Sequence, residues 1–72
     1  MLHFDHTQIK GYREFLNMSQ TRAAELAGVN QQQWSRWESG ESSPTVDNLC
    51  KIMDALMMGY DTIAFLFTDT DA

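Results

Sequence analysis

Three side chains near the middle of the chain have the chemistry needed to recognise nucleic-acid bases: Gln31, Gln32 and Arg36. A glutamine amide can donate to adenine N7 while it accepts from the adenine amino group, and an arginine guanidinium can pair in a similar bidentate way with guanine. At about 100° per residue of an α-helix, these side chains share a polar arc about 140° wide with Ser35 and Ser39. Taken alone, such an arc is also typical of an ordinary solvated helix face, so the surrounding sequence has to decide between the two interpretations.

Two tryptophans lie on the opposite side of the same predicted helix. With Gln31 set at 0°, Trp37 falls at about 240° and Trp34 at about 300°. Because they face away from the polar arc, we expect both in the core rather than stacked on a nucleobase. Gln33, at about 200°, is expected at the flank of the arc. Asn30 can cap the first turn of this helix.

The chain offers little other chemistry. His3 and His6 flank Asp5 and invite comparison with a metal site, but a third fixed ligand is missing and residues near a terminus are usually solvated. Cys50 falls on an apolar helix face and is expected to be a small core side chain rather than a nucleophile. The sequence contains no acid-base constellation and no cofactor loop. We therefore expect no catalytic residue, no metal and no cofactor.

Length and composition indicate one globular domain. A chain of 72 residues has room for a single core, and its 43% hydrophobic content is enough to fill that core. Its single cysteine cannot form an internal disulfide. The N-terminus lacks the features of a signal peptide, and no stretch approaches the roughly 18 apolar residues of a membrane span. We therefore predict one domain over residues 1–72, no membrane association, and a cytoplasmic, nucleoid-associated protein.

The net charge of −5 argues at first against a nucleic-acid partner, but the charge is unevenly distributed. Residues 1–40 carry four basic and four acidic side chains, whereas residues 41–72 carry one basic and six acidic side chains. The acidity therefore belongs to the C-terminal half of the chain, and the segment with the glutamines is neutral overall.

Hydrophobic periodicity and capping residues predict an all-α domain of five helices. The first covers residues 7–16, the second begins after Ser19 and ends at Gly28, and the third begins at Gln31. Thr45 can cap a fourth helix, whose broad apolar face is formed by Val46, Leu49, Cys50, Ile52, Met53, Leu56 and Met57. Residues 60–67 are short and apolar, so they could form a fifth helix or a strand, and residues 68–72 are expected to be a polar tail.

Two short helices joined by the sequence GVN, residues 28–30, are typical of a helix-turn-helix, in which the second helix presents its exposed side to the major groove. The sequence resembles the Cro/repressor-type (Xre-like) helix-turn-helix family, which includes lambdoid phage repressors and Cro proteins. The matching segments are SQ at 19–20, Ala24, GVN at 28–30, WSRWESG at 34–40 and PTVDNLCKIMDAL at 44–56. The resemblance covers roughly residues 7–58 and implies a compact helix-turn-helix domain. We predict that its core lies in residues 7–67 and the motif itself in residues 19–39.

The resemblance also implies roles for single residues. Gln31 and Gln32 match the leading, base-reading residues of the recognition helix, and Arg36 matches a later position that contacts a base or a phosphate. Gln20 matches a glutamine that contacts a phosphate and braces a base-reading residue. Arg13 and Glu38 match a structural pair that links the first and third helices. The residues expected at the DNA backbone are Ser19, Gln20, Arg22, Asn30, Ser35 and Ser39. Glu25 and the C-terminal acids are expected to point away from the DNA.

These observations predict a transcriptional regulator, most simply a repressor, that binds double-stranded operator DNA. The apolar residues 60–67 are expected to form a homodimer surface, by helix packing or by strand pairing. The chain departs from the family pattern at Ala23 and Trp34, where larger and smaller aliphatic residues are more usual, and its 41–44 loop lacks basic residues. An alternative is a protein-interaction module, such as an antitoxin or adaptor, whose acidic half engages a protein partner.

Overall fold

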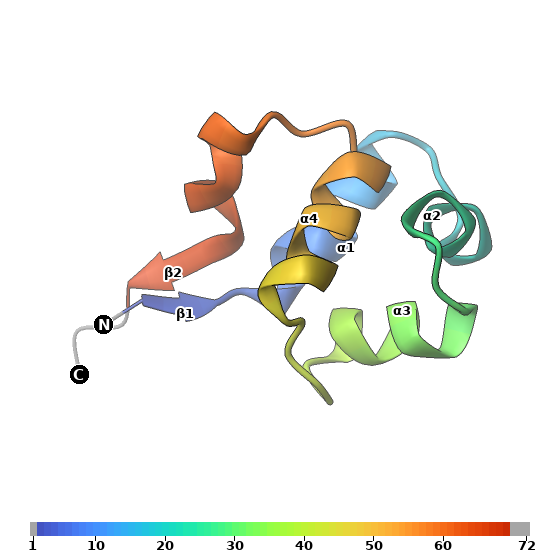
Figure 1. The fold of residues 1–72 in the computed structure, drawn as a ribbon, viewed down its shortest axis with the longest axis horizontal. Helices are drawn as coiled ribbons and strands as arrows, with labels where there is room; N and C mark the ends of the chain where they lie inside the picture. Colours follow the sequence, from blue (N-terminus) through green and yellow to red (C-terminus); the bar gives the residue numbers. More distant parts are fainter. Residues whose placement is uncertain (1, 70–72) are drawn as a thin grey trace.

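The computed structural model describes residues 2–69. Four α-helices form most of the molecule: α1 (His6–Phe15), α2 (Gln20–Ala27), α3 (Gln31–Ser39) and α4 (Val46–Ala55). A 3-10 helix, η1 (Tyr60–Leu66), follows them, and two short strands, β1 (Leu2–Phe4) and β2 (Phe67–Asp69), lie near the two ends of the chain. In Figure 1, α4 crosses in front of α1, with η1 on one side of it and α2 on the other. None of the described helices is long and apolar enough to cross a membrane.

The predicted N-caps of the three central helices are confirmed. The side chains of Ser19, Asn30 and Thr45 each accept a hydrogen bond from a backbone N–H in the first turn of the following helix, at 2.8–3.2 Å. Such caps satisfy donors that the helix itself leaves unpaired. The first helix differs from the prediction, because Asp5 caps it and it therefore begins at His6, one residue earlier.

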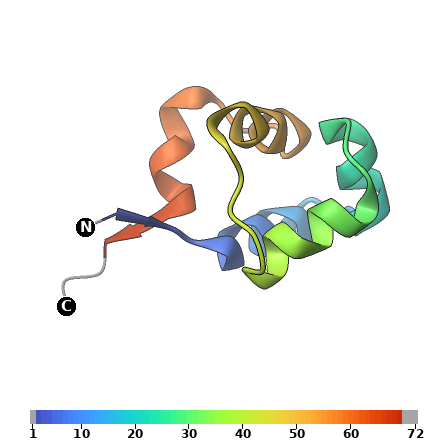
Figure 2. The ribbon, with the colours of Figure 1, turned by 60° about the horizontal axis from the view of Figure 1, so that its bottom comes forward.

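The turn between α2 and α3 depends on Gly28. Its φ of 74° lies in the left-handed region, and its N–H donates back to the last turn of α2. Glycine adopts this conformation without the steric cost that a Cβ would add. Asn30 then caps α3 directly, so the two helices are joined by a short, fixed connection. Figure 2 shows α2 and α3 meeting at the end of the molecule that lies away from the strand pair.

The core is built around the two tryptophans, as predicted. Trp34 and Trp37 are 0% and 1% exposed, and their rings pack edge to face with centroids 6.0 Å apart. The three alanines of α2, Ala23, Ala24 and Ala27, are buried, and their small side chains leave room for the tryptophan rings of the neighbouring α3. Ala23, which is smaller than the usual family residue, and Trp34, which is larger, therefore belong to the same buried cluster.

The apolar face predicted for α4 is narrower than expected. Leu49, Ile52 and Met53 are buried, but Val46 and Met57 are 77% and 74% exposed. Val46 is the first residue of the helix and extends beyond its packed part. Met57 comes after the helical cap and has a φ of 58°, so it has left the helical path that the prediction assumed.

The all-α prediction of five helices is confirmed, and the C-terminal segment forms both the fifth helix and a short strand of a small terminal pair. Residues 60–66 form the 3-10 helix η1, and residues 67–69 pair antiparallel with β1 in the register Leu2 with Asp69, His3 with Thr68 and Phe4 with Phe67. The Phe4 and Phe67 rings pack edge to face at 5.9 Å. Thr68 and Asp69, expected in a polar tail, therefore belong to a strand. The rest of that predicted tail, residues 70–72, lies outside the described residues.

Candidate nucleic-acid interface

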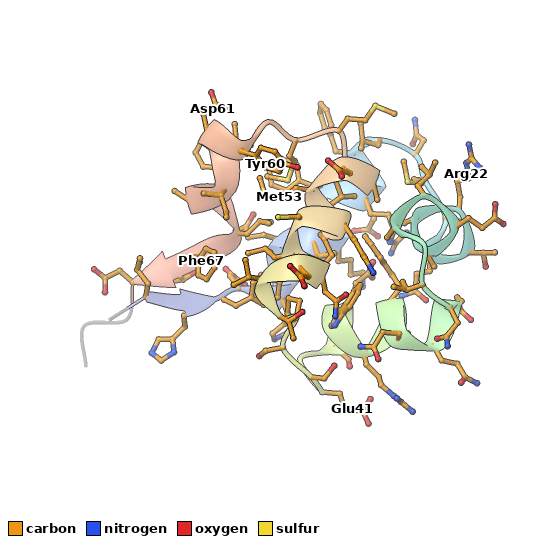
Figure 3. All side chains as sticks on the ribbon, viewed as in Figure 1. Arg22, Glu41, Met53, Tyr60, Asp61 and Phe67 are labelled. Atoms are coloured by element: carbon orange, nitrogen blue, oxygen red, sulfur yellow. The ribbon has the colours of Figure 1, made fainter. Side chains whose placement is uncertain are left out.

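The exposed side of α3 forms a shallow, polar, concave surface. It is lined by Gln31, Gln32, Ser35, Arg36 and Glu41. Gln31, Gln32 and Arg36 are exposed and Ser35 is half-buried. The structure thus brings the three residues predicted to read bases onto one surface, while Trp34 and Trp37 hold the opposite side of the same helix in the core. Figure 3 places Glu41 beside α3 at the edge of the molecule.

A buried carboxylate, Glu38, lies behind this surface. The Nε of Arg13 donates to Glu38 Oε2 at 2.6 Å, and Arg13 Nη2 donates to Oε1 at 3.1 Å. The indole N–H of Trp34 donates to Oε2, and Gln20 Nε2 donates to Oε1 at 3.0 Å. Arg13 also donates to the backbone carbonyl of Met18 at 2.8 Å, so the guanidinium ties α1 to both α3 and the start of the helix-turn-helix.

Glu38 and Arg13 are a charged pair. Burial raises the pKa of the Glu38 carboxyl, but hydrogen bonds from Arg13, Gln20 and Trp34 outweigh burial and hold that pKa below its ordinary value. The hydrogen bond to Glu38 raises the pKa of the Arg13 guanidinium. The Glu38 side chain is 4% exposed and that of Arg13 is 12% exposed, so water screens this pair only weakly. An ionised Glu38 can only accept hydrogen bonds.

This acceptor fixes the orientation of two glutamine amides. Since Glu38 can only accept, Gln20 has to present its NH₂ group to it, which leaves the Gln20 oxygen on the far side. Gln31 Nε2 donates to that oxygen at 2.9 Å. Glu38 therefore fixes the orientation of the Gln31 amide through Gln20. The carbonyl oxygen of Gln31 and one of its N–H groups remain available to a ligand. Gln20 was expected to brace a base-reading residue, and this contact joins it to Gln31, whose base-reading role stays a prediction.

Of the residues predicted at the DNA backbone, Ser35 lines the concave surface, and Gln20 and Ser39 line a second hollow that shares Ser35 with it. Several of these residues already form hydrogen bonds within the protein. The oxygens of Ser19 and Asn30 accept the capping hydrogen bonds, and Ser39 Oγ donates to the carbonyl of Arg36 at 3.2 Å. Arg22 Nη1 lies 3.4 Å from Glu25 Oε2, with both side chains exposed. Glu25 therefore lies beside Arg22 on the surface of α2, and the expectation that Glu25 points away from DNA stays a prediction.

Gln33 differs from the other two glutamines. It is half-buried, and its Nε2 donates to Ser42 Oγ at 3.2 Å. Its side chain therefore holds the loop that follows α3. Gln33 was predicted at the flank of the polar arc. Its contact with Ser42 could not be predicted from helical spacing, because Ser42 lies beyond the end of the helix.

His6 has a structural role that the sequence did not suggest. It was expected to be solvated, but it is half-buried, and its Nδ1 forms a hydrogen bond with the carbonyl of Glu38 at 2.8 Å. Its ring also lies against Gly40, where an added Cβ would come within 2.8 Å of it. Asp5 caps α1 and accepts from Thr68 at 2.7 Å. Among residues 2–69, no three potential ligands gather as a metal site would require.

The comparisons agree with this geometry. The helix-turn-helix family model matches residues 9–56. The cryptic phage CTXphi transcriptional repressor RstR of Vibrio cholerae is 34% identical over 56 residues, which are 78% of this chain and 50% of the relative. The chain thus spans about half the length of that relative.

Solved structures show the same fold. A crystal structure of the P22 c2 repressor in complex with a synthetic operator is 26% identical with a TM-score of 0.74, and the match covers 85% of this chain and 92% of that one. The solution structure of the P22 c2 DNA-binding domain has a TM-score of 0.77 over 85% and 80% of the two chains, at 26% identity. The controller protein C.AhdI of Aeromonas hydrophila, 21% identical, shares the fold with a TM-score of 0.75 over 81% and 88%. Since the family model covers more than half of the chain, this protein belongs to the Cro/repressor-type helix-turn-helix family.

Proposed function

We propose that this protein is a sequence-specific DNA-binding transcriptional regulator, acting as a repressor, that places α3 in the major groove of operator DNA. The observation that carries the proposal is the chain of hydrogen bonds from Glu38 through Gln20 to Gln31. It holds an exposed amide in a defined orientation beside Gln32 and Arg36, and a fixed donor and acceptor are what base recognition requires. The similar RstR protein is described as a transcriptional repressor, and the similar P22 c2 repressor as bound to an operator.

The net charge of −5 opposes DNA binding less strongly than its size suggests. Arg22 and Arg36 are exposed near the helix-turn-helix, and the N-termini of α2 and α3 supply partial positive charge for phosphates. The many acidic side chains of residues 41–72 lower the affinity for phosphates in general. We therefore propose that a single domain binds DNA weakly and that base contacts and dimerisation supply the rest.

DNA binding is tested by titrating the protein into labelled duplexes from the region upstream of its own gene and into duplexes of random sequence. We expect tighter binding to the upstream DNA, and binding to both duplexes that weakens as the salt concentration rises. Few exposed cations lie near α3, so the logarithm of the binding constant should fall with the logarithm of the salt concentration less steeply than for strongly basic regulators. Equal affinity for every duplex tested would contradict sequence-specific regulation.

The proposed dimer surface is the exposed side of η1. Tyr60, Ile63 and Phe65 are 62%, 39% and 60% exposed, an unusual amount of apolar surface for one short helix. Phe65 also lines an apolar groove together with Phe15 and Met57. In Figure 1, η1 lies on the side of α4 opposite α2, so a partner that packs on η1 would leave α2 and α3 uncovered.

Replacing Phe65 with glutamate is expected to produce a monomer, because a charge would have to be buried in the proposed interface. Sedimentation of the unchanged protein should give a dimer, and F65E should also lose operator binding at concentrations where the unchanged protein binds. Val46→Glu is the matched control, because Val46 is 77% exposed and begins α4 rather than η1. A stable monomer of the unchanged protein, both free and on DNA, would rule out this dimer.

A further inference from the structure

One acidic side chain lies within the proposed base-reading surface. Glu41 follows α3 directly, is exposed, and lines the same concave surface as Gln31, Gln32 and Arg36. Its backbone N–H donates to the Arg36 carbonyl at 3.0 Å. Gly40, with a φ of 80°, makes the turn that brings residue 41 back against the last turn of α3. The position of Glu41 is therefore fixed relative to Arg36.

Among the described residues, the carboxylate of Glu41 has no ion-pair partner. Within residues 2–69, ion pairs join Arg13 to Glu38 and Arg22 to Glu25, and Glu41 takes part in neither. In this part of the chain, Glu41 forms hydrogen bonds only through its backbone N–H. That N–H donates to the Arg36 carbonyl and, at 3.4 Å, to Ser39 Oγ. On the face proposed to approach DNA, a charged acceptor is repelled by a phosphate but can accept a hydrogen bond from a base.

Base chemistry restricts that donor. In the major groove, the amino groups of cytosine and adenine donate hydrogen bonds. The adenine amino group is adjacent to the N7 acceptor, which repels a carboxylate, whereas the cytosine amino group has no such neighbour on its own base. Cytosine is therefore the base that a carboxylate at this position accommodates best.

We propose that Glu41 is a specificity-determining residue that accepts a hydrogen bond from the amino group of a cytosine when α3 occupies the major groove. The inference rests on the proposed function and extends it to a base contact beyond those of Gln31, Gln32 and Arg36. It also gives a reason for an acidic residue at the edge of a DNA-binding surface. The energetic cost of bringing this carboxylate close to DNA is offset only at sites that supply the cytosine.

The test is a selection of bound duplexes from a pool with a randomised central sequence, carried out with the unchanged protein, Glu41→Ala and Asp61→Ala. We expect the unchanged protein to select a site in which one position is cytosine, with about a tenfold loss of affinity when that base pair is replaced, as for one hydrogen bond to a charged group. Glu41→Ala should select the same site without a preference at that position.

Asp61→Ala is the matched control, because it removes the same charge from η1. Figure 3 shows Asp61 and Glu41 at opposite edges of the molecule. We expect D61A to keep the cytosine preference, because Asp61 lies far from α3 and the loss of one negative charge alone should not change which base is selected. Retention of the preference by E41A, its loss in D61A, or a uniform gain in affinity of E41A without a change of selected site would overturn the role of Glu41 alone. Failure of the unchanged protein to select any sequence would overturn the proposed function as well.

Discussion

Replacing Glu38 with glutamine is expected to lower the free energy of unfolding by about 3–5 kcal/mol, the usual cost of removing one partner of a buried ion pair. The carboxylate accepts hydrogen bonds from Arg13, Gln20 and Trp34, and its side chain is 4% exposed. A glutamine of the same size would leave the Arg13 charge without its counterion and would place an NH₂ group among donors. Urea denaturation followed by tryptophan fluorescence measures the loss.

This loss is a large part of the total free energy of unfolding, which is expected to be roughly 4–11 kcal/mol for a domain of 72 residues. The matched control is Glu25→Gln, which breaks the pair between Arg22 and Glu25. Those side chains are 60% and 62% exposed, and exposed pairs of this kind contribute about 0–1 kcal/mol. Similar losses in E38Q and E25Q would show that burial of the Glu38 pair is not what stabilises the fold.

The pH dependence of stability provides a second measurement on the same variant. Because the pKa of Glu38 is lowered in the folded state, its stabilisation is fully present above the ordinary value of 4.5 and is lost as the pH falls through the folded-state pKa. The free energy of unfolding of the unchanged protein should therefore fall on acidification below this range. Glu38→Gln should flatten that fall. Part of the slope should remain, since hydrogen bonds from Thr7 and Thr68 also lower the pKa of Asp5.

Local features of the sequence predicted the helical part of the fold well. Ser19, Asn30 and Thr45 cap helices because the capping contact spans only three residues, and such short-range rules can be applied without knowing the rest of the structure. The two tryptophans were placed in the core by the angular spacing of a single helix. Met57 does not lie on the predicted helical face, because helical spacing does not indicate where the helix ends.

Contacts between distant parts of the chain could not be predicted from such rules. The pairing of β1 with β2 joins Leu2 to Asp69, and neither three-residue segment has enough alternation to be recognised as a strand. The contact between His6 and the carbonyl of Glu38 joins residues 32 positions apart. The orientation of the Gln31 amide depends on Gln20 and Glu38 together, and only the folded structure shows all three in contact.

The buried ion pair and the proposed DNA-binding surface are thus connected by hydrogen bonds. Glu38 is stabilised as a carboxylate by Arg13, and the carboxylate sets the orientation of Gln20 and, through it, of Gln31. A fixed amide loses less conformational entropy on binding than a free one, so in the proposed complex the core would contribute to recognition without contacting DNA. This relation distinguishes Gln31 from Gln32, which shares the surface but not the hydrogen bonds to Gln20 and Glu38 among residues 2–69.

Replacing both Gln31 and Gln32 with alanine is expected to remove most of the preference for operator DNA, because each good bidentate contact contributes about 1–3 kcal/mol of discrimination between bases. Affinity for random duplexes should change little, since phosphate contacts supply most of that binding. Both side chains are exposed, so the denaturation midpoint should stay close to that of the unchanged protein. Gln33→Ala is the matched control, because this third glutamine of the segment bonds to Ser42 instead of facing the concave surface. Equal losses on operator and random DNA, or the same loss of discrimination in Q33A, would show that Gln31 and Gln32 do not read bases.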